Sequence, residues 1–208
     1  IATEDYGMLG RYTESHEAGR AFMGDGMDVK RTATVPMSAM WCVAPWIQSP
    51  DGSINRQVYM ADDRESASVA HIYGQNIAAA ESMTAWGNVA YSYHPANLKE
   101  VADLELANGI NQFVIHESAH QPSDEYVPGF SLGGIGQWFN RHDSWADMAY
   151  TWVDYMSRSS FMLQAGENVA DILWYYGEDN SVCSEFGRFP DMPAGYEWDY
   201  CSPHALMN

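Results

Sequence analysis

Apolar residues recur with helical spacing in three segments of the chain. The clearest of these runs from His142 to Ala165. One face of it carries apolar residues at intervals of three and four: Trp145, Met148, Ala149, Trp152, Val153, Met156 and Leu163. A second helix is predicted from Pro95 to Ala107, because proline suits the first helical turn and Asn108-Gly109 is a stop signal. A third is predicted from Asp62 to Tyr73, whose opening acids complement the helix dipole.

Short apolar runs without helical period follow these helices, at Asn76 to Ala80, Ile110 to Ile115 and Val169 to Tyr176. They are typical of buried strands. Helix followed by strand, three times, predicts β/α crossovers and a parallel sheet. Upstream, Arg11 to Glu14 and Thr34 to Met37 are candidates for two more strands.

The fold class predicted from this order is α/β, with consecutive β/α units of a TIM-type barrel. A complete barrel needs eight strands and about 250 residues, so at most five strands fit a chain of 208 residues. We therefore predict a partial β/α barrel catalytic domain at 1–176. Residues 177–208, rich in Gly, Pro and aromatics, are predicted to form a loop-rich tail that leads towards an accessory module. The remainder of the same polypeptide is an expected partner, since the chain opens on Ile1 rather than Met.

The net charge of the chain argues against some classes of binding partner. With 28 acidic and 10 basic residues the formal charge is −18, which repels phosphate backbones and anionic membranes. Nucleic acid and membrane are therefore not expected partners, and no run of about 18 apolar residues is present. Such acidity suits extracellular surroundings, so a secreted or periplasmic protein is expected, and a cation site is compatible with it. Pairing of Cys183 with Cys201 stays open.

Polar residues stand where the predicted strands end, which is where parallel β/α folds place their chemistry. Four of the five strand ends carry acids or histidines, and we expect them to converge on one pocket. They are Glu14, His16 and Glu17; Glu81; His116, Glu117 and His120; and Glu178 and Asp179.

Glu81 is the leading candidate for catalysis, because the small apolar run before it delivers a carboxylate to the barrel mouth. General acid or base work needs a carboxylate tuned by neighbouring charge and burial. Glu14 and Glu17 are candidates for a second catalytic carboxylate, and a pair roughly 6.5 to 9.5 Å apart suits inversion at an anomeric carbon. The alternatives are a salt-bridged or capping role for Glu81 and a solvated turn for the other two.

A zinc peptidase is the main alternative function, because His116 to His120 matches the H-E-x-x-H pattern. That motif binds zinc only when a helix places both histidines on one face. Here a strand-like run precedes it and Gln121-Pro122 follows it, so no helix is expected. A non-catalytic carbohydrate-binding fragment is the third possibility.

Longer strings resemble one family. Asp63 to Gly74 (DRESASVAHIYG) and Ala79 to Thr84 (AAESMT) resemble the α-L-rhamnosidases of glycoside hydrolase family 106. Further blocks agree in order and spacing, at Val35 to Trp41, Phe139 to Arg141 and Asp171 to Asp179. The resemblance covers nearly the whole chain from about Tyr12.

The resemblance implies a multi-domain inverting glycosidase around a TIM-like barrel, with a carbohydrate substrate and calcium at the active site. It makes Glu81 the general base. It also implies that the family's acid pair precedes Ile1, in which case Glu14 and Glu17 are pocket or metal residues; the metal ligands stay unknown. The expected substrate-binding residues are His116, Glu117, His120, Trp41, Trp138 and Asn140. Glu117 and Ala39 depart from the commoner family residues, a small polar residue and an acid.

Overall fold

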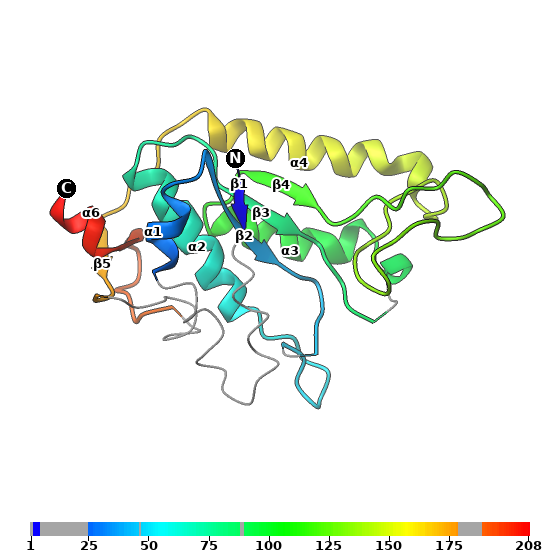
Figure 1. Ribbon diagram of the computed structural model, residues 1–208, viewed down its shortest axis with the longest axis horizontal. Coiled ribbons are helices and arrows are strands. Elements are labelled where there is room, and N and C mark those ends of the chain that lie inside the picture. The colour runs from blue at the N-terminus through cyan, green and yellow to red at the C-terminus, as the bar shows by residue number, and fades with distance from the viewer. Residues whose placement is uncertain (1, 5–24, 46, 88–89, 179–188) are drawn as a thin grey trace.

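Four parallel strands form the central sheet of the computed structural model (Figure 1). The sheet order is β1 (Ala2–Glu4), β2 (Val35–Met40), β3 (Ala79–Ser82) and β4 (Gln112–Ile115). The structure describes residues 2–4, 25–45, 47–87, 90–178 and 189–208. The predicted strand at Arg11 to Glu14 lies outside them. Sequential strands pair in order, so the predicted parallel β/α arrangement is confirmed for this part of the chain.

The helices connect and cover these strands. They are α1 (Gly26–Lys30), α2 (Gln57–Ile72), the short 3₁₀ turn η4 (Ala90–Ser92), α3 (Pro95–Ala107), the 3₁₀ turn η5 (Ala146–Met148) and α4 (Ala149–Gln164). Figure 1 shows α4 running alongside β4, and Gln164 Nε2 donates to the Asn111 carbonyl beside that strand at 2.7 Å.

Side-chain contacts show which face of the sheet the helices cover. Ser38 Oγ donates to Asp63 of α2 at 2.5 Å, and Ser82 Oγ donates to Glu105 of α3 at 2.6 Å. Side chains alternate between the two faces of a strand, so Glu81, next to Ser82, faces away from these helices. In register beside Glu81 are Ala39 and Val114. Glu81 therefore lies on the face that a closed barrel turns inwards.

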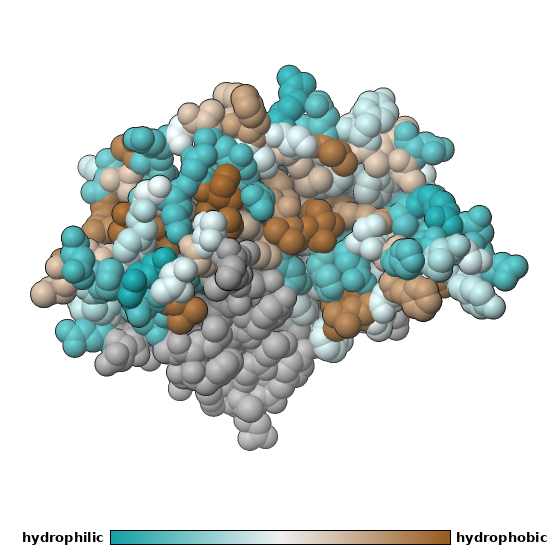
Figure 2. Space-filling view, turned by 45° about the horizontal axis from the view of Figure 1, so that its top comes forward, coloured by the Kyte–Doolittle hydropathy of each residue, from teal (hydrophilic) through white to brown (hydrophobic). Residues whose placement is uncertain are grey.

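The barrel is not closed within the described residues. Val114 is 40% exposed on the inward face of β4, whereas the interior of a closed barrel is packed with side chains. Large apolar side chains are also exposed along α4, among them Val153, Phe161 and Met162. Figure 2 shows brown apolar patches interrupting the hydrophilic surface on one face of the molecule.

One strand prediction is wrong in its pairing. The segment predicted at Val169 to Tyr176 forms β5 (Ile172–Tyr175), but β5 pairs with β6 (Trp198–Cys201) in a separate parallel sheet and does not extend the sheet at β4. The region predicted as a loop-rich tail thus contains β6 and a short helix, α6 (Pro203–Met207).

Polar anchors hold β6 against α2. The guanidinium of Arg64 pairs with Glu197 and lies 5.2 Å from the ring centroid of Trp198. Asp199 Oδ1 accepts from Ser68 Oγ at 3.0 Å and lies 2.9 Å from His71 Nδ1. These contacts join β6 to α2, while β5 and β6 form a sheet separate from the central one.

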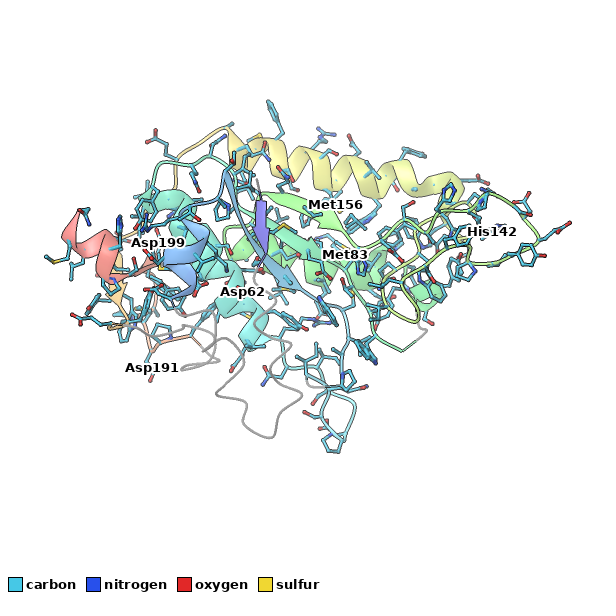
Figure 3. The ribbon with its side chains drawn as sticks, viewed as in Figure 1. Asp62, Met83, His142, Met156, Asp191 and Asp199 are labelled. Atoms are coloured by element: carbon cyan, nitrogen blue, oxygen red, sulfur yellow. The ribbon has the colours of Figure 1, made fainter. Side chains whose placement is uncertain are left out.

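The acids of α2 were predicted to begin the helix, but in the structure they lie inside it. The helix begins at Gln57, and Asp62 and Glu65 are fully buried at its second and third turns. The buried ammonium of Lys30 lies 2.6 Å from Asp62 Oδ1 and 3.0 Å from Glu65 Oε1. Asp62 Oδ2 also accepts the Ala39 N–H at 3.1 Å, and Asp62 is labelled in Figure 3. Because buried charges require partners, this network fixes α1, α2 and β2 together.

For a second pair of buried acids the described residues show no ion pair. Asp63 on α2 and Glu105 on α3 are both 0% exposed. Burial raises the pKa of both carboxyl groups well above the ordinary values, although the hydrogen bonds from Ser38 and Ser82 oppose the rise. The negative charge of Asp63 raises the pKa of Glu105 further. Each carboxyl group therefore holds its proton more tightly in the folded chain than in the unfolded chain.

This pair predicts that stability declines as the pH rises. When a carboxyl group has a higher pKa in the folded state than in the unfolded state, its protonation stabilises the fold. This stabilisation is fully present below about pH 4 and is lost as the pH rises through the folded-state pKa. The loss reaches about 1.4 kcal/mol per pH unit for each proton released. Glu105→Gln keeps an acceptor for Ser82 Oγ but cannot bind or release a proton. The free energy of local unfolding of α3 should therefore depend less on pH in this variant.

Hydrogen exchange of α3 amides across about pH 5 to 8 measures this dependence in the whole protein. Glu100→Gln is the matched control, because Glu100 lies on the same helix with its side chain 71% exposed, and it should behave like the parent. Equal slopes for the parent and Glu105→Gln would show that the buried acid does not govern the pH dependence.

Candidate active site

Glu81 and His116 meet at the carboxyl ends of β3 and β4. Glu81 Oε1 accepts from Thr84 Oγ1 and lies 3.6 Å from His116 Nδ1. His116 directly follows β4, and its main-chain N–H donates to the Ser82 carbonyl at 3.1 Å. Neighbouring parallel strands end at the same edge, so the sequence correctly predicted this meeting. Glu81 is only 7% exposed, so the described residues shield its carboxylate from most solvent.

Glu117 completes the cluster from the other side of the imidazole. Its Oε2 lies 3.5 Å from His116 Nε2, while its Oε1 accepts the Leu132 N–H at 2.9 Å. Gly136 packs closely against it: a Cβ added there would stand 3.2 Å from Glu117 Cγ, and the φ of Gly136 is +106°. The segment around Leu132 and Gly136 therefore holds Glu117 in place, so two carboxylates flank one histidine.

His120 lies apart from this cluster. It is exposed, stacks on Phe130 with ring centroids 6.1 Å apart, and forms an isolated bridge with the same residue. No helix runs from His116 to His120, since β4 ends at Ile115 and an irregular segment follows. The prediction that this motif lacks the helix needed for zinc is confirmed.

The two tryptophan candidates are mostly buried. Trp41 is 6% exposed and stacks between Tyr59 and Trp86, with both centroid distances 6.4 Å. Trp138 is 9% exposed and packs edge-on against Tyr91 at 5.5 Å. In the described residues neither presents an open platform for a sugar ring, and their contact with substrate stays a prediction.

Asn140 lies beside a surface pocket of about 530 Å³. Its Nδ2 donates to Tyr91 Oη at 2.7 Å, which fixes the side-chain amide. The pocket wall is mainly apolar and includes Phe139 and Trp152, together with the buried carboxyl of Asp143. Burial raises the pKa of Asp143 to about 6. Asp143 was not among the predicted site residues, so this perturbed carboxyl was not anticipated.

The predicted convergence of all strand-end acids on one pocket is wrong for Glu178. Because β5 pairs with β6 rather than β4, Glu178 lines a separate pocket of about 290 Å³ with Asp25, Asp28 and His204. Glu14, His16, Glu17 and Asp179 lie outside the described residues. The cluster that the structure does show consists of Glu81, Thr84, His116 and Glu117, named below as the Glu81 cluster.

Calcium at the site stays a prediction for the described residues. Within them no three His, Cys, Asp or Glu side chains are grouped closely enough to hold a metal ion. Glu81 and Glu117 lie on either side of the His116 imidazole. Among the described helices none is long and apolar enough to cross a membrane. Among the described residues Cys201 has no disulfide partner, and because Cys183 lies outside them, the pairing of Cys183 with Cys201 stays open.

Comparisons of the sequence with known proteins found one matching family and one similar curated protein. The α-L-rhamnosidase profile of glycoside hydrolase family 106 matches residues 3–208. A protein of Formosa agariphila that carries the provisional name beta-glucuronidase is 37% identical over 185 residues, which are 88% of this chain and 14% of that protein.

A solved structure supports the same assignment. The structure of a rhamnosidase from Novosphingobium sp. PP1Y matches with a TM-score of 0.78 and 45% sequence identity, over 88% of this chain and 17% of that one. The chain thus spans a small part of the length of both relatives. Since the family profile covers nearly every residue, the chain belongs to the α-L-rhamnosidases of glycoside hydrolase family 106.

Proposed function

We propose that the protein carrying this chain is an inverting α-L-rhamnosidase that acts on rhamnose-containing glycosides or polysaccharides, with Glu81 as its general base. The observation that carries the proposal is the placement of the Glu81 carboxylate at the inward end of β3, in contact with Thr84 and His116. Family membership supplies the reaction class. The residues of the Glu81 cluster supply a shielded carboxylate at the edge where β/α barrels gather their chemistry.

In this mechanism Glu81 accepts a proton from a water molecule as the water attacks the anomeric carbon. A second carboxylic acid protonates the departing glycosidic oxygen from the opposite face of the sugar, and the two carboxyl groups leave room for the water between them. His116 lies beside Glu81 and, when protonated, offsets the charge of both flanking carboxylates. The proposed source of the acid is a residue outside the described part of the chain.

The charge of the cluster favours a neutral deoxy sugar over a uronic acid. Glu81 and Glu117 place two carboxylates around one histidine, with no arginine or lysine paired to either in the described residues. A glucuronate carboxylate bound nearby would be repelled by both. Rhamnose has a methyl group at the corresponding position and suffers no such repulsion.

Hydrolysis assays with the whole protein test the proposal. 4-Nitrophenyl α-L-rhamnoside should be cleaved with a higher kcat/KM than 4-nitrophenyl β-D-glucuronide. A preference for the glucuronide would indicate a uronic acid substrate, without changing the family to which the chain belongs. Chelator-sensitive cleavage of casein without glycosidase activity would instead support the zinc peptidase alternative.

A further inference from the structure

We infer that Thr84 is a positioning residue for the reaction, whose hydroxyl fixes both the Glu81 carboxylate and the proton position on His116. The inference rests on the proposed function, because it assigns Thr84 a task at the same site. The Thr84 side chain is fully buried at 0% exposure. Its Oγ1 donates to Glu81 Oε1 and lies 3.2 Å from His116 Nδ1.

A left-handed backbone residue brings Thr84 to this position. In a regular strand residues three apart face opposite sides, so Thr84 would point away from Glu81. Met83, between them, has a φ of +71°, which is rare for a residue other than glycine. Figure 3 labels Met83 just beyond β3. The turn at Met83 breaks the alternation and returns Thr84 to the face of Glu81.

The main chain holds this conformation in place. The Met83 N–H donates to the Met40 carbonyl at 3.2 Å, and the Cys42 N–H donates to the Thr84 carbonyl at 2.7 Å. Residues in such sparsely populated conformations cost free energy and persist where surrounding contacts determine them, often at functional sites. Here the consequence of the unusual backbone is the contact between Thr84 and Glu81.

The number of available protons determines the direction of the hydrogen bonds among Thr84, Glu81 and His116. A threonine hydroxyl has one proton, and Glu81, when ionised, can only accept. If Thr84 donates to Glu81, the contact with His116 Nδ1 is satisfied only when Nδ1 carries a proton and donates to Oγ1. Neutral His116 then has an unprotonated Nε2, and protonated His116 can donate from Nε2 towards Glu117 Oε2, 3.5 Å away. One buried hydroxyl thus connects the proposed base to a histidine of defined tautomer.

Three variants of the whole protein test this role with 4-nitrophenyl α-L-rhamnoside. Thr84→Val keeps the shape but removes the hydroxyl, and Thr84→Ser keeps the hydroxyl. We expect Thr84→Val to lower kcat by about 10- to 100-fold, the size of one hydrogen bond to a charged group, with KM little changed. Thr84→Ser should restore most of the parent kcat. Should Thr84→Val not fold, Thr84→Ala takes its place.

Ser82→Ala is the matched control. Ser82 is also fully buried and its hydroxyl also donates to a carboxyl group, but on the opposite face of the strand, at Glu105. It should keep the parent kcat. The positioning role is refuted if the hydroxyl-free variants keep the parent kcat, if Thr84→Ser is as impaired as Thr84→Val, or if Ser82→Ala loses as much. Inactivity of the parent itself towards the rhamnoside would refute the proposed function instead.

Discussion

Glu81→Gln should lower kcat on an aryl α-L-rhamnoside by about 10² to 10⁴-fold in the whole protein, the usual contribution of a general base. Glutamine keeps the size of the side chain and an acceptor for Thr84 Oγ1, but it cannot take the proton of the attacking water. Because Glu81 is only 7% exposed, bulk water has little access to the site and cannot take over the role of the base. Initial rates with 4-nitrophenyl α-L-rhamnoside, below and above KM, measure the effect.

Glu178→Gln is the control for this prediction. Glu178 also follows a parallel strand, but it lines the separate pocket with Asp25 and His204. The control should retain the parent kcat. A Glu81→Gln variant with nearly the parent rate would contradict the assignment of the base, while leaving the family and the fold unaffected.

The second large effect concerns folding. Lys30→Met should destabilise the region around α2 by about 3 to 5 kcal/mol, the cost of removing one partner from a buried ion pair. Lys30 is 1% exposed, and its Nζ contacts Asp62 Oδ1, Glu65 Oε1 and Ser66 Oγ. Methionine fills most of the volume but removes the ammonium group that both buried acids contact. Hydrogen exchange of α2 amides in the whole protein measures the change.

Lys99→Met provides the comparison, because Lys99 pairs with Asp103 while 49% exposed. Exposed pairs contribute little because solvent screens them, so this variant should stay close to the parent. A loss for Lys30→Met as small as that for Lys99→Met would show that the buried network does not stabilise the fold.

Elements with strong local signals were predicted well from the sequence. The α3 helix begins at Pro95 and ends at Ala107, as its first-turn proline and following Asn-Gly signal indicated. The start of α2 was missed because its acids resemble a helix N-terminus in sequence. In the structure they bind Lys30, a partner more than 30 positions earlier in the chain. No local pattern contains that contact.

The contrast between local sequence signals and long-range contacts also explains which site residues were predicted. Glu81 and His116 were predicted to meet because they end successive parallel strands, and β3 and β4 do pair. Glu178 was misplaced because the pairing of β5 with β6 depends on contacts between β6 and α2. The role of Thr84 depends on the positive φ of Met83, and methionine gives no sequence signal for that conformation.

The stereochemistry of the first product tests the central claim most directly, namely that Glu81 acts as a base on water in an inverting rhamnosidase. ¹H NMR of the whole protein with 4-nitrophenyl α-L-rhamnoside would follow the anomeric proton of the released sugar. The account predicts that β-L-rhamnose forms first and then mutarotates, because water attacks the face opposite the leaving group. Initial release of α-L-rhamnose would contradict it, since retention requires a covalent intermediate and a nucleophile in place of a base.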